Sequence, residues 1–199
     1  MAILIDKEKI ENLNFNSDNL EYKIGIATQT LERNIGFISN CDNKTSIVLT
    51  AIGVLLTIIL TNDGLNEIFN IIKNCIRIKN FCDILYLICF LVSVLAMILG
   101  IWRLGSVLIA KTSEEANGVE GINSRIFFSG IRKNADYKTY LSKFYSMTKE
   151  ELLDELIAQI YINADIATQK YNKFNSGFKY ASIGFSGFVV ILLVGIYIY

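Results

Sequence analysis

The chain has 199 residues, and its 19 Lys and Arg balance 19 Asp and Glu. It contains no His and no Pro, which removes the usual general base near pH 7, the commonest zinc ligand and the commonest cause of helix kinks. The composition therefore argues against histidine-based catalysis and zinc sites, and it favours long, straight helices.

The first 44 residues form a polar segment that carries one apolar helical stripe. Its members recur at steps of three or four residues: Leu20, Ile24, Ala27, Leu31, Ile35 and Ile38. This spacing is typical of an amphipathic helix. Because no Pro or Gly separates Ile38 from the apolar run that follows, we expect one continuous helix over 19–60.

Three runs contain no Lys, Arg, Asp or Glu and are therefore uncharged: 45–61, 84–102 and 180–199. As helices, the two longer runs nearly span the ~30 Å hydrocarbon core of a bilayer, and the first run spans about 25 Å. Every Lys, Arg, Asp and Glu lies outside these runs. The sequence therefore predicts an integral membrane protein with three transmembrane helices.

Basic residues are distributed unequally between the segments that flank these runs. Five precede the first run, three lie in 62–83, eleven lie in 103–179 and none follows the third run. Because cytoplasmic segments are rich in Lys and Arg, we expect 1–44 and 103–179 in the cytoplasm, with the N-terminus inside. Segment 62–83 is then a short extracytoplasmic connector, either an interfacial amphipathic helix or a plain loop.

Within 103–179 we expect helical extensions of the spans. The second span is expected to continue past Trp102 to a C-cap near Gly118. A further helix begins at "TKEE", where Thr148 and Glu151 can form a capping box. Its apolar stripe runs into the third span: Leu153, Ile157, Ile160, Ala164, Ala167, Tyr171, Phe174 and Phe178. The expected fold is an all-α membrane protein whose three transmembrane helices extend into a cytoplasmic helical bundle.

The stretch "SRIFFSGIRKN", at 124–134, is a candidate phosphate-binding segment. Basic side chains can hold a phosphate, a glycine lets the backbone approach it, and hydroxyls can donate to it. The residues concerned are Arg125, Arg132, Lys133, Gly130, Ser124 and Ser129. The alternative is structural: Arg132 and Lys133 form a solvated turn, and Phe127 and Phe128 close the end of the bundle.

The spans carry small residues at the spacing that lets helices approach closely in lipid. The pairs are Gly53 with Thr57, Ala96 with Gly100, and Ser182 with Ser186. These faces are expected to pack within the molecule or between copies in a homo-oligomer. Because no charged side chain lies inside a span, a transporter or proton relay is disfavoured.

The four cysteines show no CxxC spacing, which disfavours metal and thioredoxin-like sites. Cys41, Cys75, Cys82 and Cys89 are interpreted as small packing residues. A disulfide between Cys75 and Cys82 is left open in case the connector meets an oxidising compartment. We expect no metal and no other cofactor.

The order of segments and several stretches carry a likeness to a known family. The most specific stretches are "LTAIGVLL" after "NKTS", and "QIYINADIATQKY" within 148–173, with "RIFFSGIRK" between them. Together they resemble the transmembrane effector family of Pycsar antiphage systems over about 28–199. The resemblance implies a bacterial inner-membrane effector, encoded with a pyrimidine cyclase that makes cyclic CMP or cyclic UMP on phage infection, which impairs the membrane so that the infected cell dies.

The same resemblance implies which residues sense the nucleotide. They match the family's segment ahead of its last long helix, and that helix itself: Arg125, Phe127, Phe128, Arg132, Tyr140, Gln159, Tyr161 and Lys170. With Lys133 of the basic segment, these are the candidate ligand-binding residues. The expected partners are a cyclic pyrimidine mononucleotide (cUMP or cCMP), the lipid bilayer and further copies of the chain, and no nucleic acid is expected.

The leading hypothesis is a signal-gated membrane effector that causes abortive infection. Nucleotide binding near 124–134 would change helix packing, and the spans would rearrange. A constitutive membrane scaffold or accessory subunit that docks a cytoplasmic partner is an alternative of another class.

An enzyme is not expected, because no nucleophile–base pair can be assembled. The acids Glu150, Glu151, Asp154 and Glu155 lie in the first turns of a helix, where they favour the helix dipole.

Overall fold

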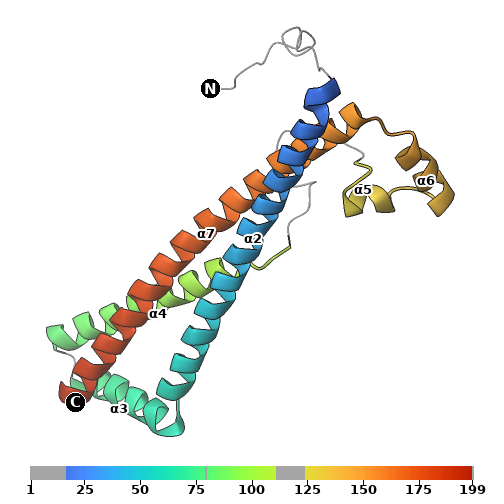
Figure 1. Ribbon diagram of the computed structural model, residues 1–199. Coiled ribbons are helices and arrows are strands. Elements are labelled where there is room, and N and C mark those ends of the chain that lie inside the picture. Colours follow the sequence, from blue (N-terminus) through green and yellow to red (C-terminus); the bar gives the residue numbers. More distant parts are fainter. Residues whose placement is uncertain (1–16, 79, 111–123, 199) are drawn as a thin grey trace. The chain divides into compact units, whose positions relative to one another are not determined.

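The computed structural model describes residues 17–78, 80–110 and 124–198. Throughout this part of the chain the regular elements are helices (Figure 1). They are α2 (Ser17–Ile59), α3 (Asn62–Ile78), α4 (Phe81–Gly105), α5 (Phe128–Arg132), α6 (Tyr137–Tyr145) and α7 (Lys149–Ile198). The predicted all-α fold is confirmed.

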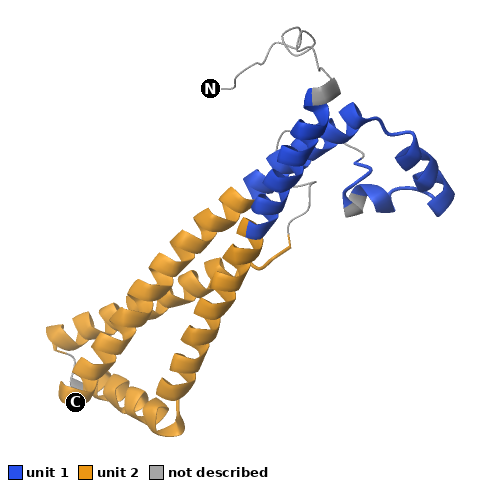
Figure 2. Cartoon of the chain, viewed as in Figure 1, with its two compact units in different colours: residues 1–36, 112–166 blue, residues 37–111, 167–199 orange. Residues whose placement is uncertain are grey.

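The chain divides into two compact units (Figure 2). Unit 1 comprises 1–36 and 112–166, and unit 2 comprises 37–111 and 167–199. Helices α3 and α4 belong to unit 2, whereas α5 and α6 belong to unit 1. Helices α2 and α7 are each continuous across a unit boundary, so each contributes residues to both units.

Three helices are long and apolar enough to cross a membrane: α2 over Asn19–Ile59, α4, and α7. In unit 2 these helices expose large apolar side chains such as Ile58, Val92 and Leu193. Such exposure is unfavourable in water and favourable in hydrocarbon, where the helices also satisfy their own backbone hydrogen bonds. The chain is therefore a membrane protein with three candidate spans, as the uncharged runs predict.

Glycines allow α4 and α7 to pack closely in unit 2. A Cβ built on Gly100 would overlap the backbone of Ala181, and one built on Gly184 would overlap the backbone of Met97. The two backbones therefore meet directly, which is how helices gain packing energy in lipid. The rings of Phe90 and Phe188 pack alongside, with centroids 5.6 Å apart.

Helix α3 is amphipathic, which agrees with the helical one of the two alternatives considered for the connector. Its Ile71 and Cys75 are buried, whereas Phe69 is exposed. The Ile71 side chain lies close to Gly195 of α7, and the Tyr86 hydroxyl of α4 donates to the Ile191 carbonyl at 3.0 Å. Helices α3, α4 and α7 thus pack together in unit 2. Cys75 and Cys82 are both free thiols, so the disulfide considered from the sequence is absent.

Unit 1 contains a small apolar core between α2 and the first turns of α7. The buried residues are Leu20, Ala27, Leu153 and Leu156, with Ile24, Leu31, Ile126, Leu152 and Ile160 packed against them. The two predicted stripes are wrong at three positions, because Ile35, Ile157 and Phe178 are about half exposed. The buried face of α7 instead passes through Leu156.

Helix α4 ends at Gly105, well before the end predicted near Gly118. The backbone N–H of Ser106 donates to the Trp102 carbonyl at 3.0 Å, and its hydroxyl donates to the Arg103 carbonyl at 2.7 Å. Glycine costs about 1 kcal/mol relative to alanine within a helix, and serine competes for backbone hydrogen bonds, so the pair Gly105–Ser106 favours termination. Residues 111–123, which include Gly118, lie outside the described residues.

Candidate functional site

One buried carboxylate, that of Glu155, fastens the segment before α5 to α7. Its Oε2 accepts from the Ser124 hydroxyl at 3.0 Å and from the Arg125 backbone N–H at 2.7 Å, and its Oε1 accepts from Arg125 Nε at 2.7 Å. Arg125 Nη1 also donates to Glu151 Oε2 at 3.0 Å. We call Ser124, Arg125, Glu151 and Glu155 the Glu155 clasp. It links residues far apart in the sequence within unit 1.

The start of α7 positions the acids of the clasp. The Thr148 N–H donates to Glu151 Oε2 at 3.0 Å, and the Glu151 N–H donates to Thr148 Oγ1 at 3.2 Å, which confirms the predicted capping box. The Thr148 N–H is the main reason that the pKa of Glu151 is lowered, with Arg125 contributing further. The hydrogen bond to Glu155 is the main reason that the pKa of Arg125 is raised. Arg125 is therefore already neutralised by carboxylates of its own chain.

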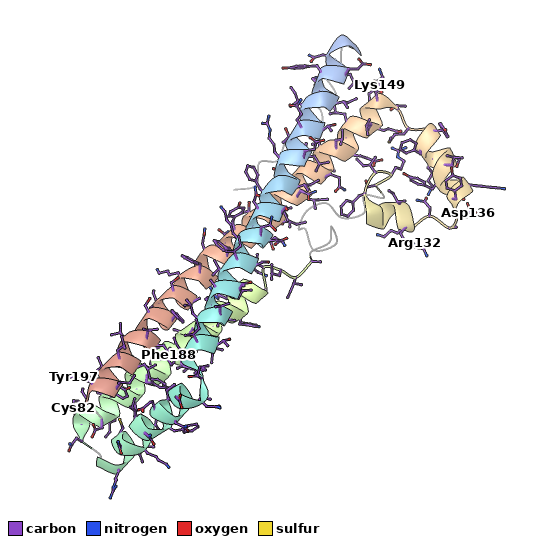
Figure 3. The ribbon with its side chains drawn as sticks, turned by 60° about the horizontal axis from the view of Figure 1, so that its bottom comes forward. Cys82, Arg132, Asp136, Lys149, Phe188 and Tyr197 are labelled. Atoms are coloured by element: carbon purple, nitrogen blue, oxygen red, sulfur yellow. The ribbon has the colours of Figure 1, made fainter. Side chains whose placement is uncertain are left out.

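An open groove of about 400 Å³ lies where α5 ends and α6 begins. We call it the α5–α6 groove. Its lining residues are Ile131, Arg132, Asn134, Ala135, Asp136, Tyr137 and Tyr140. Arg132 and Asp136 stand near the two ends of the turn between the helices (Figure 3). The groove thus combines a cation, a carboxylate and aromatic rings.

The amide of Asn134 holds the turn that forms this groove. Its Nδ2 donates to the carbonyls of Gly130 and Ile131 at 3.3 and 3.0 Å, and its Oδ1 accepts from Lys143 Nζ at 2.8 Å. A Cβ on Gly130 would overlap the Ser124 carbonyl, so only glycine fits there. These contacts fix α5 against the segment that the Glu155 clasp holds.

Asp136 and Tyr140 anchor α6 beside the same turn. Asp136 caps α6 by accepting from the Thr139 N–H at 2.7 Å, which lowers the pKa of its carboxyl. The Tyr140 hydroxyl donates to the Arg125 carbonyl at 3.0 Å, and its ring lies near that of Phe144. Tyr137, by contrast, leaves 72% of its surface exposed. Arg132 is exposed as well, so a ligand in the groove can contact both its guanidinium and the Tyr137 ring.

The structure brings together part of the predicted ligand-binding set. Arg132 and Tyr140 line the α5–α6 groove, and Lys133 follows Arg132 as the C-cap of α5. Arg125 belongs to the Glu155 clasp, and Phe127 is the N-cap of α5. The side chains of Phe128 and Ser129 lie outside the described residues.

The three candidates on α7 lie apart from that groove. Gln159 is buried, and its Oε1 has no hydrogen-bond partner among the described residues. Tyr161 is exposed. Lys170 belongs to unit 2, where its buried ammonium pairs with Asp42 Oδ1 of α2 at 2.6 Å. Its charge is thus satisfied within the protein.

The small residues of the spans occupy different environments. Gly100 meets Ala181 closely and Ala96 is partly buried, whereas Ser182 and Ser186 are exposed. A Cβ on Gly53 would meet no atom of the described chain within 4 Å, and the Thr57 hydroxyl donates to the Gly53 carbonyl at 2.9 Å. The faces of Gly53, Ser182 and Ser186 are open to lipid or to another copy of the chain.

Sequence reasoning missed Glu155, Asn134, Asp136 and Tyr137 as parts of this region. One signal for Glu155 was present: Glu151 and Glu155 are four residues apart on a helix, where like charges repel unless a cation lies between them. Asn134, Asp136 and Tyr137 carry no comparable signal in the sequence. Among the described residues, no group of three or more His, Cys, Asp or Glu is placed to hold a metal ion.

Fold and site together define a class: a helical membrane protein with three candidate spans and a polar helical unit that carries an open groove. Within that class, a model of the Pycsar effector protein domain matches residues 26–198. The chain belongs to the Pycsar effector family and is an antiphage defence effector.

Two relatives match over most of their length. The Pycsar effector protein GmPycTM of Gulbenkiania mobilis is 30% identical over 183 residues, which cover 87% of this chain and 92% of the relative. The Pycsar effector protein EcPycTM of Escherichia coli is 24% identical over 172 residues, covering 86% and 89%. No solved structure matches this chain.

Proposed function

We propose that this effector is gated by a cyclic pyrimidine mononucleotide, cUMP or cCMP, which binds the α5–α6 groove on the cytoplasmic side. Binding rearranges the spans of a homo-oligomer in the bacterial inner membrane, the membrane loses its integrity, and the infected cell dies. The observation that carries this proposal is the match to the Pycsar effector domain over 26–198, which includes residues of both units.

The contents of the groove suit such a nucleotide. The Arg132 guanidinium can bind the phosphate through paired N–H donors. The exposed ring of Tyr137 offers a stacking surface for the base, and stacking contributes about 1–3 kcal/mol per base. The Asp136 carboxylate in the same groove disfavours a ligand with several negative charges, and a cyclic phosphodiester carries only one. The volume of about 400 Å³ falls within the usual range for small-molecule sites.

Helix α7 offers a route from the groove toward the spans. The Glu155 clasp ties the segment before α5 to α7, and α7 continues without interruption to Ile198. In unit 2, the Lys170–Asp42 pair joins α7 to α2. A nucleotide changes helix packing only to the extent that it binds one arrangement better than the other, so we infer tighter binding to the membrane-impairing arrangement.

The proposal is tested by expressing the full chain in Escherichia coli, supplying cUMP or cCMP, and following membrane potential with a dye. We expect one nucleotide to depolarise the cells. Arg132→Gln should weaken nucleotide affinity of the purified protein roughly 10- to 100-fold, because it removes hydrogen bonds to a charged group. Lys138→Gln is the matched control, because it removes an exposed charge of α6 outside the groove. Depolarisation by neither nucleotide would favour the scaffold alternative.

A further inference from the structure

A second groove lies in unit 2, where α4 ends beside α7. It has a volume of about 610 Å³, and its lining residues are Trp102, Arg103, Ser106, Asn172, Lys173 and Ser176. Leu104 is fully buried here, and a Cβ on Gly177 would touch it, so the two helices are in firm contact beside the groove. We call it the α4–α7 groove. It shares no residue with the α5–α6 groove.

Its position along the helices corresponds to the lipid headgroups. Arg103 is the first charged residue after the uncharged run 84–102, and Lys173 lies two helical turns, about 10 Å, before the run that starts at Tyr180. Trp102 is 72% exposed, and the Arg103 guanidinium lies 5.2 Å from the centroid of the Tyr180 ring. Exposed Trp and Tyr beside basic residues are typical of the membrane interface.

The groove is lined by two cations and no carboxylate. Within the described part of the chain, neither Arg103 nor Lys173 has an acidic side chain within ion-pair distance. The hydroxyls of Ser106 and Ser176 donate to carbonyls of their own helices. The guanidinium and the ammonium are therefore the strong donors left for a ligand, and an anion between them relieves their mutual repulsion.

We propose that the α4–α7 groove binds the phosphate of an anionic membrane lipid, such as phosphatidylglycerol. Arg103 binds the phosphate oxygens through paired donors, Lys173 adds a second positive charge, and the Trp102 ring contacts the acyl-glycerol region. The site joins the end of α4 to α7, so a bound lipid holds these two helices together. The assignment does not depend on nucleotide sensing.

The test uses the purified full chain, reconstituted in equal amounts of phosphatidylglycerol and phosphatidylcholine and analysed by native mass spectrometry for retained lipid. The wild type is expected to retain phosphatidylglycerol preferentially. The double variant Arg103→Gln, Lys173→Gln should bind it roughly 30-fold more weakly, because each basic residue near an anionic membrane surface strengthens binding by roughly five- to sixfold. A matched control, Arg33→Gln with Lys138→Gln, removes two exposed charges in unit 1 and should retain the lipid.

A competitor distinguishes a lipid from a soluble phosphate. Excess glycerol phosphate should not displace the retained lipid, because it lacks the acyl chains that hold the lipid beside the spans. Displacement by glycerol phosphate would overturn the lipid assignment, as would equal retention by the double variant and the wild type. Should the double variant fail to fold, each single variant is measured instead, and unchanged retention in both contradicts the proposal.

Discussion

Glu155 shows how one side chain can define a local structure. It is only 8% exposed, yet it accepts three hydrogen bonds, two of them from Arg125. A buried carboxylate is tolerated when hydrogen bonds and a nearby cation replace its water. The same contacts place the segment that leads into α5. The position of the α5–α6 groove therefore depends on Glu155 although Glu155 does not line it.

Replacing Glu155 with alanine should loosen this segment. The change leaves Ser124 and Arg125 without their main acceptor, and Arg125 keeps only Glu151. We expect a local loss of about 2 kcal/mol, or roughly 30-fold in the opening equilibrium. Hydrogen exchange of residues 124–146 in the detergent-solubilised chain measures it. Glu150→Ala removes an exposed acid from the first turn of α7 and should leave exchange unchanged.

Protonation of Asp136 at low pH should weaken the N-cap of α6. The pKa of Asp136 is lowered in the folded chain because its carboxylate accepts from the Thr139 N–H. A lowered pKa means that the stabilisation is present above the ordinary value near 3.8 and is lost as the pH falls below it. The NMR shift of the Thr139 amide should follow this titration with a midpoint below 3.8. Asp136→Asn should abolish the titration and keep the cap, and a midpoint at or above the ordinary value would contradict this account.

At the scale of the elements, α2, α4 and α7 could be predicted because their signals are local. An uncharged run and a helical stripe require no knowledge of partners, and the capping box at Thr148 lies within four residues. Helices α5 and α6 were not predicted, because such short helices depend on side chains such as Asn134 and Asp136 that bond across a turn. The face of α7 that meets α4 also escaped prediction, because small residues occur on opposite sides of this helix. Gly184 and the exposed Ser182 are two residues apart and so point in nearly opposite directions.

The glycine contacts between α4 and α7 allow a test of helix packing. Gly100→Val and Gly184→Val each place a side chain where the partner helix has backbone, so either variant must push the helices apart. Overpacking of this kind costs about 1–3 kcal/mol. The midpoint of thermal aggregation, followed by size-exclusion chromatography in detergent, should fall in both variants. Gly53→Val is the matched control, because a Cβ there meets no described atom; an equal fall in all three variants would refute the packing argument.

At the scale of the whole molecule, the pairing of distant residues limited what the sequence could reveal. Lys170 entered as a ligand candidate through the family resemblance, and its contact with nucleotide stays a prediction. In the structure its ammonium is buried and paired with Asp42, which lies on another helix 128 residues away. Periodicity marks which face of each helix is apolar, but it cannot show which acid of α2 meets which base of α7. The same limit applies to the Glu155 clasp.

The membrane orientation inferred from basic residues makes a prediction about cysteine chemistry. Cys82 (Figure 3) is exposed in the first turn of α4, just before the uncharged run. Cys41 and Cys75 are buried. Cys89 is exposed but lies within the run 84–102, where lipid excludes a water-soluble reagent. A membrane-impermeant maleimide added to spheroplasts should therefore label the wild type once, and Cys82→Ser should abolish labelling. In the Cys82→Ser background, Lys138→Cys should react only after lysis, because the eleven basic residues of 103–179 predict a cytoplasmic location for this segment. Labelling of Lys138→Cys in intact spheroplasts would show the opposite orientation, and the α5–α6 groove would then face away from the cytoplasmic signal that we propose.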